Sequence, residues 1–493
     1  MDDKFCVIGL DLGTTSVKTL TVDQTGVTRF RAARKISTNI GPNGRAVQDP
    51  FEIRDALNSV FELALHAARK DGLLVHRVGF SAAMHSLMIV SEEGEPLTQA
   101  MTWMDSRAKK QAELLWESLN GKKIYEETGT PIHAMSPFVK LVWLRETQPQ
   151  LLKMGNRIAS VKEWIWHAWF DEWMIDESMA GATGLYDVEK RSWHEHALTR
   201  IGVNPAQLSR IVPTSYRQAG CRETRLQLAG LTADTLFSIG STDGVLANLA
   251  LGVTDSSKMV FTVGTSMAVR SGAKRKITNP SLRPFCYRLD DQRFVIGAPS
   301  NSGGVILEWL MNMLYGDDRA ENVDETLAVL IRDAGNVELQ SLYCLPYAAG
   351  ERAPLWDEEA KASFIGLHLK HQKIHLVRAA IEGMIYNAKW LIDNLSASTG
   401  NPEQVYLSGK LFDELWICQL CANVFGVPVV RQTLEDASTI GAILLAADTA
   451  EFAQSLKRCE RSEKMDPEEE MEEVQRLRFK EYQRLCRLLY PSA

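Results

Sequence analysis

The sequence predicts an α/β protein built from two large domains of related construction. Its 493 residues exceed what one ordinary hydrophobic core holds. Two similar segments, "VIGLDLGTTSVKTLTVD" at 7–23 and "SKMVFTVGTSMAVRSGA" at 257–273, each open about half of the chain. Strand-like runs lead through Gly-containing turns into helical patterns at 236–251 and 405–425, as is typical of α/β folds. The repeated segment predicts two domains that hold one ligand between them.

The first segment predicts a β-hairpin with a turn suited to phosphate. Val7 to Leu10 and Val17 to Val22 have the pattern of strands, and "DLGTTS" between them is dense in turn formers. Its backbone N–H and hydroxyl groups suit phosphate oxygens, and its carboxylate suits Mg²⁺ or the waters around it. An ordinary hairpin is the alternative, because the Walker A pattern GxxxxGK[ST] is absent. The candidate nucleotide-binding residues are Asp11, Gly13, Thr14, Thr15, Ser16 and Lys18.

The second segment repeats this pattern about 250 residues further along. Met259 to Val263 and Met267 to Arg270 are strand-like, and the turn between them presents Gly264, Thr265 and Ser266. One such hairpin is ambiguous, whereas two favour a clamp on the phosphates of one nucleotide.

Asp243 stands where a predicted strand turns into a helix. The strand covers Leu236 to Ile239, and the helical pattern Val245 to Leu251 follows the turn "GSTDG". Free N–H groups and the helix dipole favour a carboxylate at this place, so a plain helix cap is one interpretation. The other, which we favour beside a phosphate clamp, is a general base that receives a hydroxyl proton during phosphoryl transfer.

Three further segments complete the pattern in the second half of the chain. The strand-like run Val405 to Leu407 meets Ser408-Gly409 and a helix to Phe425, and glycine there lets the backbone lie against an adenine or ribose. The stretch 435–447 is a Ser-, Gly- and Ala-rich helix of the kind that packs tightly on a neighbour. From about Glu451 the apolar residues are periodic in a charged context, which predicts an amphipathic helix packed on the domain surface.

Composition narrows the class of protein. With 45% hydrophobic and 24% charged residues the chain has the composition of a soluble globular protein, and no apolar run reaches the roughly 18 residues of a membrane span. Charged residues interrupt the Trp-rich stretch 161–175, which is therefore expected to be a mostly buried helix. A net charge of −7 argues against general nucleic-acid binding. The scattered Cys and the absence of a visible signal peptide predict a reduced, cytoplasmic protein, and the CxxC at Cys418 and Cys421 has no second pair to complete a zinc site.

Together these segments resemble the FGGY carbohydrate kinases, from about Phe5 to Ala447. The resemblance is carried, in this order, by "DLGTTSVK", "SAAMHS", "TWMDSRA", "GTPIHAMSP", "STDGVLAN", "VGTSMAVR", "YAAGERAPLWD", "SGKLFDELW" and "EDASTIGA". It implies two ribonuclease-H-like (actin-like ATPase) domains with a ligand cleft between them. The expected units are an N-terminal domain with the sugar site and first phosphate loop (1–252), a C-terminal nucleotide-binding domain (253–450) and a helical tail (451–493).

The same resemblance implies Mg²⁺-dependent transfer of the γ-phosphoryl group of ATP to a sugar hydroxyl, with Asp243 as the base. Asp11 and Asp243 are the expected metal ligands. The nucleotide side gains Gly264, Thr265, Gly303, Gly304 and Gly409, and the sugar side is expected to hold Met84, His85, Trp103, Asp105, Arg107 and Asp243. In one departure, Lys410 stands where many members have a second glycine, which leaves the adenine packing and nucleotide preference open.

Within the family, the chain is most similar to the branch that phosphorylates gluconate, a similarity that "GTPIHAMSP" carries best. The expected acceptor is therefore D-gluconate, phosphorylated at its terminal hydroxyl to 6-phospho-D-gluconate. Its carboxylate needs cationic or donor partners when stripped of water. The candidates are His85, Arg107, His133 and Lys162, with His133 favoured for selectivity.

Two alternatives remain. One is a xylulokinase or another sugar kinase of the same family, and the remote one is an actin- or heat-shock-type ATPase without a sugar substrate. The expected partner is a small sugar or sugar acid, with no nucleic acid and no membrane. A homodimer is left open.

Overall fold

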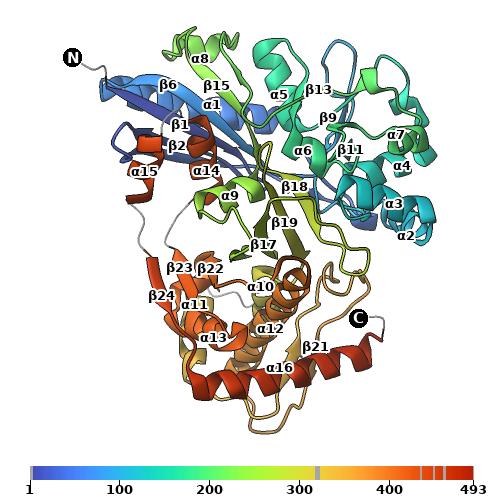
Figure 1. Ribbon diagram of the computed structural model, residues 1–493, viewed down its shortest axis with the longest axis vertical. Helices are drawn as coiled ribbons and strands as arrows, with labels where there is room; N and C mark the ends of the chain where they lie inside the picture. Colours follow the sequence, from blue (N-terminus) through green and yellow to red (C-terminus); the bar gives the residue numbers. More distant parts are fainter. Residues whose placement is uncertain (1–3, 317–322, 433–435, 448–449, 459–461, 492–493) are drawn as a thin grey trace.

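Two mixed β-sheets, each containing one of the predicted hairpins, organise the computed structural model (Figure 1). The structure describes residues 4–316, 323–432, 436–447, 450–458 and 462–491. The first sheet has the strand order β14-β15-β6-β1-β2-β3, and the second has the order β18-β19-β17-β16-β22-β23-β24. The sheets lie in two lobes, which are the upper and lower halves of Figure 1 and are called here the N-terminal and C-terminal lobes. The expected two-domain α/β architecture is confirmed.

The N-terminal lobe is formed mainly by the first half of the chain. Its main sheet uses β1 (Phe5–Leu12), β2 (Ser16–Asp23), β3 (Thr28–Lys35), β6 (Leu74–Ala82), β14 (Arg217–Gln218) and β15 (Leu236–Thr242). Its short strands are β4 (Asn39–Ile40), β5 (Ala46–Gln48), β7 (Met88–Val90), β8 (Ala100–Met101), β9 (Arg157–Ala159), β10 (Met174–Asp176), β11 (Tyr186–Asp187), β12 (Ser192–Trp193) and β13 (Arg210–Val212). Its helices are α1 (Pro50–Lys70), α2 (Lys109–Glu117), α3 (Leu119–Thr128), α4 (Pro137–Thr147), α5 (Val161–Phe170), α6 (Glu177–Ala182), α7 (Glu195–Ile201), α8 (Thr224–Leu228) and α9 (Asp243–Ala250).

The C-terminal lobe follows the same plan with a longer sheet. Its strands are β16 (Lys258–Val263), β17 (Met267–Ala273), β18 (Phe285–Arg288), β19 (Phe294–Ser300), β20 (Tyr343–Leu345), β21 (Ser363–Ile365), β22 (Gln404–Ser408), β23 (Val429–Gln432) and β24 (Ser462–Met465). Its helices are α10 (Gly304–Tyr315), α11 (Val323–Asp333), α12 (Lys373–Thr399), α13 (Leu415–Phe425) and α16 (Glu469–Leu489). Short 3₁₀ turns lie at Pro42–Gly44, Pro149–Leu152, Pro205–Gln207, Ala334–Asn336 and Lys410–Asp413.

Both expected hairpins are confirmed. β1 pairs antiparallel with β2, and β16 pairs antiparallel with β17. In each lobe the first hairpin strand also pairs in parallel with a later strand, β6 in the N-terminal lobe and β22 in the C-terminal lobe. Since Asp11 lies opposite Lys18 in the β1–β2 register, the turn between them is held at the end of a central, doubly paired strand. The tip of each hairpin therefore stands on a rigid sheet.

Alternation along β1 explains how its sheet is covered on both faces. Ile8 and Leu10 are buried in the core that includes α1, whereas Val7 packs with Ile440 and Ile443 of α14 (Ala437–Ala446). The approach of α14 is close, because a Cβ at Gly9 or Gly79 would overlap the backbone of that helix. The expected tight packing of this small-residue helix is confirmed, and its neighbours include β1, β6 and α9.

The end of the chain crosses between the lobes. In Figure 1, α14 and α15 (Ala450–Arg458) lie beside the β1–β2 sheet of the N-terminal lobe, although they follow most of the C-terminal lobe in sequence. The stretch expected to be a helical tail also contains β24, which pairs antiparallel with β23 before the long helix α16 begins. This exchange ties the two lobes together, and the boundary at 252/253 remains our proposed division.

Two other expectations concern the Trp-rich stretch and the cysteines. Residues 161–170 form the buried helix α5, which ends where Asp171 takes a left-handed conformation. No helix among the described residues is long and apolar enough to cross a membrane. Cys418 and Cys421 lie buried on α13 as free thiols. The other cysteines that the structure describes, on other elements, are also buried and free.

Candidate active site

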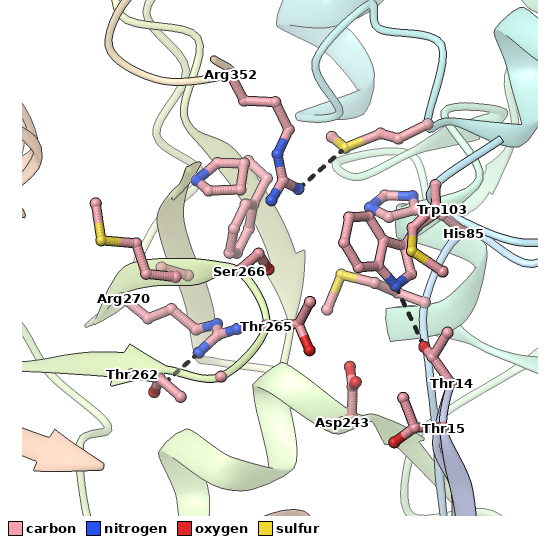
Figure 2. Close-up of a pocket in the computed structure, with 18 residues that line it drawn as sticks. Thr14, Thr15, His85, Trp103, Asp243, Thr262, Thr265, Ser266, Arg270 and Arg352 are labelled. Carbon is pink, nitrogen blue, oxygen red and sulfur yellow. Dashed lines mark hydrogen bonds between the residues drawn. The ribbon is translucent and has the colours of Figure 1, made fainter. Parts of the chain in front are cut away.

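The tips of the two hairpins meet at a cavity of about 350 Å³ between the lobes (Figure 2). Thr14 and Thr15 line it from the first tip, and Gly264, Thr265 and Ser266 line it from the second. Asp243 projects into it from the start of α9, as Figure 2 shows. Groups that are about 250 residues apart in sequence thus face one space.

Asp243 has the properties of a proton acceptor. It is the first residue of α9, after Thr242 at the N-cap, and its Oδ1 accepts a hydrogen bond of 2.7 Å from the N–H of Gly244. Burial, followed by the negative charge of Asp11, raises the pKa of Asp243 to about 6. The carboxylate is therefore mostly ionised at neutral pH yet close to the value at which it can take up a proton.

Asp11 is buried with incomplete hydrogen bonding. Its Oδ2 accepts a hydrogen bond of 3.0 Å from Ser438 of α14, whereas its buried Oδ1 has no hydrogen-bond partner among the described residues. Burial raises the pKa of Asp11, against the opposing effects of the Ser81 hydroxyl, of Ser438 and of the charge of Lys18. An orphaned, hard carboxylate oxygen is a fitting partner for Mg²⁺ or a water bound to it.

The donor set near Asp11 fits a metal that arrives with phosphates. Within the described residues, no three His, Cys, Asp or Glu side chains are placed to hold a metal ion together. Mg²⁺ bound with a nucleotide typically takes only one or two carboxylates and completes its shell with phosphate oxygens and water. Asp11 and Asp243 offer such a pair.

The first hairpin tip is fixed by contacts on both sides. The N–H of Gly13 donates to the carbonyl of Ser16 at 3.1 Å, which closes the turn. The indole N–H of Trp103 donates to Thr14 Oγ1 at 3.2 Å, as drawn in Figure 2. Lys18 does not face the cavity, because its ammonium pairs with Asp436 at 2.9 Å. Its position does not favour the expected contact with a phosphate.

The second tip lies against the start of α10. The N–H of Gly304 donates to the carbonyl of Gly264 at 2.8 Å, and the N–H of Val305 donates to that of Thr265 at 3.1 Å. A Cβ at Gly303 would overlap the backbone of Ser266. The glycine pair thus permits a helix N-terminus to approach the phosphate turn, which favours anions there.

A second cavity of about 600 Å³ opens on the other side of Gly264 and Thr265, within the C-terminal lobe. Apolar side chains alternate in its wall with the charged residues Glu308, Lys410, Asp413 and Glu414, and it is large enough for a nucleoside. The residues that line it include Gly304, Leu307, Leu327, Ile331, Lys410, Leu411 and Asp413. Lys410, the departure from the family pattern, therefore lies at the expected nucleotide side.

Gly409 should be intolerant of substitution. Its φ of +127° is a glycine conformation, and a Cβ there would overlap the carbonyl oxygen of Val263, the residue before the second tip. We expect Gly409→Ala to raise the KM for ATP by about tenfold and to lower Tm, because the strained backbone costs on the order of 1–3 kcal/mol. Steady-state kinetics and a thermal melt measure both.

Gly400→Ala is the matched control. Gly400 also has a positive φ, +86°, but a Cβ there would meet nothing within 4 Å. A Gly409→Ala protein with the KM of the parent would show that the turn beside the nucleotide cavity adapts freely.

On the sugar side, His85 presents a neutral imidazole. It lines the cavity between the lobes with Met84 and Trp103, and its Nδ1 lies 2.7 Å from the carbonyl oxygen of Ala182. Burial, then the charge of Lys140, lowers the pKa of His85 to about 3. The carbonyl contact assigns the proton to Nδ1, so Nε2 is a hydrogen-bond acceptor. The hydroxyl of Tyr287 lies 3.5 Å from Nε2, a long contact that leaves this nitrogen able to accept from a sugar hydroxyl as well.

The cations expected to hold a substrate carboxylate are mostly committed elsewhere. Arg107 forms a two-pronged pair with Asp105, with contacts of 2.7 and 2.9 Å, and does not line the cavity. Lys162 is buried and pairs with Asp176 at 2.6 Å, away from the cavity lining. Neither position favours the expected contact with a substrate.

His133 and Asp105 line a third space of about 330 Å³ that shares Trp103, Met135 and Arg352 with the first cavity. His133 Nδ1 accepts a hydrogen bond from the N–H of Met135 at 3.1 Å, and its Nε2 lies 3.1 Å from Glu358 Oε1. Burial lowers the pKa of His133. Selectivity through His133 remains a proposal, and the position favours a neutral donor rather than a cation.

Three candidate functional residues were not predicted from the sequence. Arg270 and Arg352 both line the cavity, and each stands inside a motif, "VGTSMAVR" and "YAAGERAPLWD", that was considered for its other residues. Lys140 lies in the helical run "SPFVKLVW", where a single Lys gives no signal. The motif arginines could have been found as cations within segments already assigned to the site.

Lys140 joins the loops that form the sugar side. It is buried to 1% exposure, and its ammonium donates to the carbonyls of His85, Thr102 and Met135 at 3.2, 2.6 and 2.8 Å. These residues flank or line the cavity wall. Burial lowers the pKa of Lys140 to about 7. One side chain of α4 thus fixes three separate loops around the acceptor space.

We expect Lys140→Met to raise the KM of the acceptor about tenfold and to lower Tm by several degrees. Each buried carbonyl left without a donor costs about 1–3 kcal/mol, partly offset by removing the buried amine. Steady-state kinetics with varied acceptor and a thermal melt provide the measurement. The exposed Lys110→Met is the control, and parental acceptor KM and Tm in the Lys140 variant would contradict the assigned role.

Comparison with known proteins agrees with this geometry. Residues 6–250 match the N-terminal domain, and residues 259–450 the C-terminal domain, of the FGGY family of carbohydrate kinases. The chain is similar to the gluconokinase of Bacillus subtilis (strain 168), with 34% identity over 452 residues, 89% of this chain and 86% of that protein.

Two solved structures have the same fold. The gluconate kinase from Lactobacillus acidophilus superposes with a TM-score of 0.88 at 27% identity, over 99% of this chain and 98% of that one. The ligand-bound xylulose kinase from the same organism superposes with a TM-score of 0.87 at 27% identity, over 98% of each chain. The expected fold of two actin-like domains with a cleft between them is confirmed.

Proposed function

Because the chain belongs to the FGGY family of carbohydrate kinases, we propose that it transfers the γ-phosphoryl group of ATP to the terminal hydroxyl of D-gluconate. The product is 6-phospho-D-gluconate. The observation that carries the proposal is the single cavity in which Asp243 faces both hairpin tips. The 34% identity to a gluconokinase supports the choice of acceptor.

In the proposed reaction, Asp243 accepts the proton of the terminal hydroxyl as that oxygen attacks the γ-phosphorus. The backbone N–H groups and hydroxyls of the hairpin tips, including Thr14 and Thr265 in the cavity wall, donate to the phosphate oxygens. His85 Nε2 accepts from a sugar hydroxyl, and the buried walls exclude water from the phosphoryl group.

The metal is part of the proposal as well. Mg²⁺ bound with the nucleotide would neutralise developing charge on the phosphates, and Asp11 and Asp243 are the residues that would hold it or its waters. The orphaned Oδ1 of Asp11 is the observation that supports this assignment.

The two alternative functions differ in how well the comparisons support them. An actin- or heat-shock-type ATPase is excluded as the class, since both halves of the chain match carbohydrate kinases. A xylulokinase is the rival acceptor choice, supported by the xylulose kinase of similar structure. We place the enzyme in the cytoplasm with a small sugar acid as its partner, and the homodimer stays an open expectation.

The test is an acceptor screen with a coupled assay for ADP release. D-gluconate, D-xylulose, L-ribulose, L-rhamnulose and glycerol are compared by kcat/KM, and NMR of the product locates the phosphate. We expect the largest kcat/KM with gluconate and a phosphate on its terminal carbon. A preference for xylulose would replace the acceptor and leave the kinase chemistry in place.

A further inference from the structure

Two arginines of the C-terminal lobe enter the cavity, and no carboxylate of the described residues lies at ion-pair distance from either. Arg270 on β17 donates through Nη1 to Thr262 Oγ1 at 3.3 Å, and its buried Nε has no hydrogen-bond partner in the described parts of the chain. Arg352 donates through Nε to Asn301 Oδ1 at 2.7 Å and through Nη2 to the carbonyl of Ser300 at 2.9 Å. Its Nη1 faces the sulfur of Met135, at 3.8 Å.

Each arginine has one carboxylate in its neighbourhood, Asp243 for Arg270 and Glu351 for Arg352, but forms no ion pair with it. Burial lowers the pKa of Arg352 to about 10; the negative charge of Glu351 opposes this shift, and the positive charge of Arg270 adds to it. Burial also lowers the pKa of Arg270, against the negative charge of Asp243. Glu351, next to Arg352 in sequence, bonds instead to Ser300 and Ser302, and burial raises its pKa to about 7. Two guanidinium groups that line one cavity without a direct ion pair are both available to an anion placed between them.

The position of the arginines separates this anion from the nucleoside part of the bound nucleotide. Neither Arg270 nor Arg352 lines the 600 Å³ cavity on the nucleotide side, whereas both line the space that holds His85 and Trp103. In Figure 2 the two guanidinium groups approach from the C-terminal lobe, opposite His85 and Trp103, and Asp243 lies at another side of the space. Arg352 also lies over the Trp103 ring, 5.2 Å from its centroid.

We propose that Arg270 and Arg352 form the binding site for the carboxylate of the acceptor. The inference rests on the proposed function, since it names the residues by which that site distinguishes a sugar acid from a neutral sugar. An extended six-carbon acid with its terminal hydroxyl at Asp243 carries its carboxylate several carbons away, toward the arginines. Guanidinium groups suit that carboxylate because their N–H groups match its two oxygens.

The experiment measures gluconate affinity by calorimetry without ATP, in the parent, Arg270→Lys, Arg352→Lys and the corresponding Met variants. The Lys variants keep the charge and lose the planar fork, which guards against misfolding when the charge is removed. Arg275→Met, at an exposed position of the same lobe, is the control, and thermal melts verify folding. The affinity for D-glucitol, the neutral polyol of the same length, is measured in parallel.

We expect each Met variant to weaken gluconate binding by about 10- to 100-fold while leaving D-glucitol binding within about threefold, as loss of a charge-assisted hydrogen bond predicts. The Lys variants should fall between parent and Met variants. Equal losses on both compounds, or a selective loss in only one of the two positions, would overturn the two-arginine site. So would parental gluconate affinity with reduced turnover, because that result assigns the arginines to the phosphoryl group.

The experiments distinguish a failure of the proposed function from a failure of the carboxylate site. If the parent phosphorylates xylulose and not gluconate, the acceptor assignment is lost, and a parent that also fails to bind gluconate overturns the inference with it. If the parent phosphorylates gluconate and the Met variants bind it as the parent does, only the carboxylate site is lost.

Discussion

Asp243→Asn should lower kcat by roughly 10²- to 10⁴-fold, the usual effect of removing a positioned general base. The amide keeps the size of the side chain and its bond to the N–H of Gly244, but it cannot accept the hydroxyl proton. Affinity for ATP and for the acceptor should stay within about threefold, because the hairpin tips and the sugar-side wall are untouched. Steady-state kinetics and ATP binding by calorimetry test both parts.

The pH profile supplies a second readout of the same residue. Burial and the charge of Asp11 raise the pKa of Asp243 to about 6 from its ordinary value of 3.8. The base acts in its ionised form, so kcat/KM of the parent should rise with pH through about 6 and be lost as pH falls below it. The Asp243→Asn protein should lack this limb.

Asp49→Asn is the matched control for a role in helix capping alone. Asp49 is the N-cap of α1 and accepts a hydrogen bond of 2.9 Å from the N–H of Phe51, outside the cavity. If Asp243→Asn changes kcat as little as Asp49→Asn does, then Asp243 serves only the start of α9.

The hairpins could be predicted because their signals are local. A strand pattern of period two, a turn rich in Gly and hydroxyl residues, and a second strand lie within 17 residues in each case. The position of Asp243 between a strand and a helix is equally local. The meeting of these pieces at one cavity needed the tertiary fold, and the repeated segment was the feature that pointed to it.

The partners of charged groups could not be predicted from sequence. Arg107 and Lys162 have the side chains expected for carboxylate binding, but Asp105 and Asp176 already satisfy them. Arg270 and Arg352 have no such carboxylate partner within the described residues, and this difference depends on contacts rather than on residue type. Sequence motifs thus located the site, whereas the distribution of charge within it came from packing.

The crossing of α14 between the lobes is the other feature without a local signal. The small residues predicted tight packing, which holds: a Cβ at Gly441 would overlap the carbonyl of Leu246 on α9. The sequence of α14 alone did not indicate which lobe it packs against. The crossing matters for the site, because Ser438 on this helix reaches Asp11 of the first hairpin.

Asp11→Asn should raise the Mg²⁺ concentration for half-maximal activity by roughly 10- to 100-fold, comparable with the loss of a residue that orients a metal's ligands. The substitution keeps an oxygen that can accept the hydrogen bond from Ser438 and removes the negative charge of the carboxylate. The carboxylate oxygen lost is Oδ1, which has no hydrogen-bond partner among the described residues. A Mg²⁺ titration at fixed ATP and acceptor measures the effect, with free Mg²⁺ calculated for each ATP concentration.

The same substitution should not destabilise the ligand-free protein. Burial raises the pKa of Asp11, so the folded state disfavours its ionised form, and the stability it contributes falls as pH rises through that pKa. A neutral amide removes this penalty, and the Tm of the ligand-free variant at neutral pH should equal or exceed that of the parent.

Asp23→Asn serves as the control, because its expected effects on Tm and on the Mg²⁺ requirement are the opposite of those of Asp11→Asn. Burial alone would raise the pKa of Asp23, but hydrogen bonds from Thr25, Val27 and Arg29 outweigh it and lower that pKa. The ionised carboxylate therefore stabilises the fold, so its removal should lower Tm and leave the Mg²⁺ requirement unchanged. An Asp11→Asn protein with a lower Tm and the Mg²⁺ requirement of the parent would identify Asp11 as a structural residue of β1. The opposite result is expected because the fold disfavours the charged form of Asp11, whereas a metal ion and its phosphates require it.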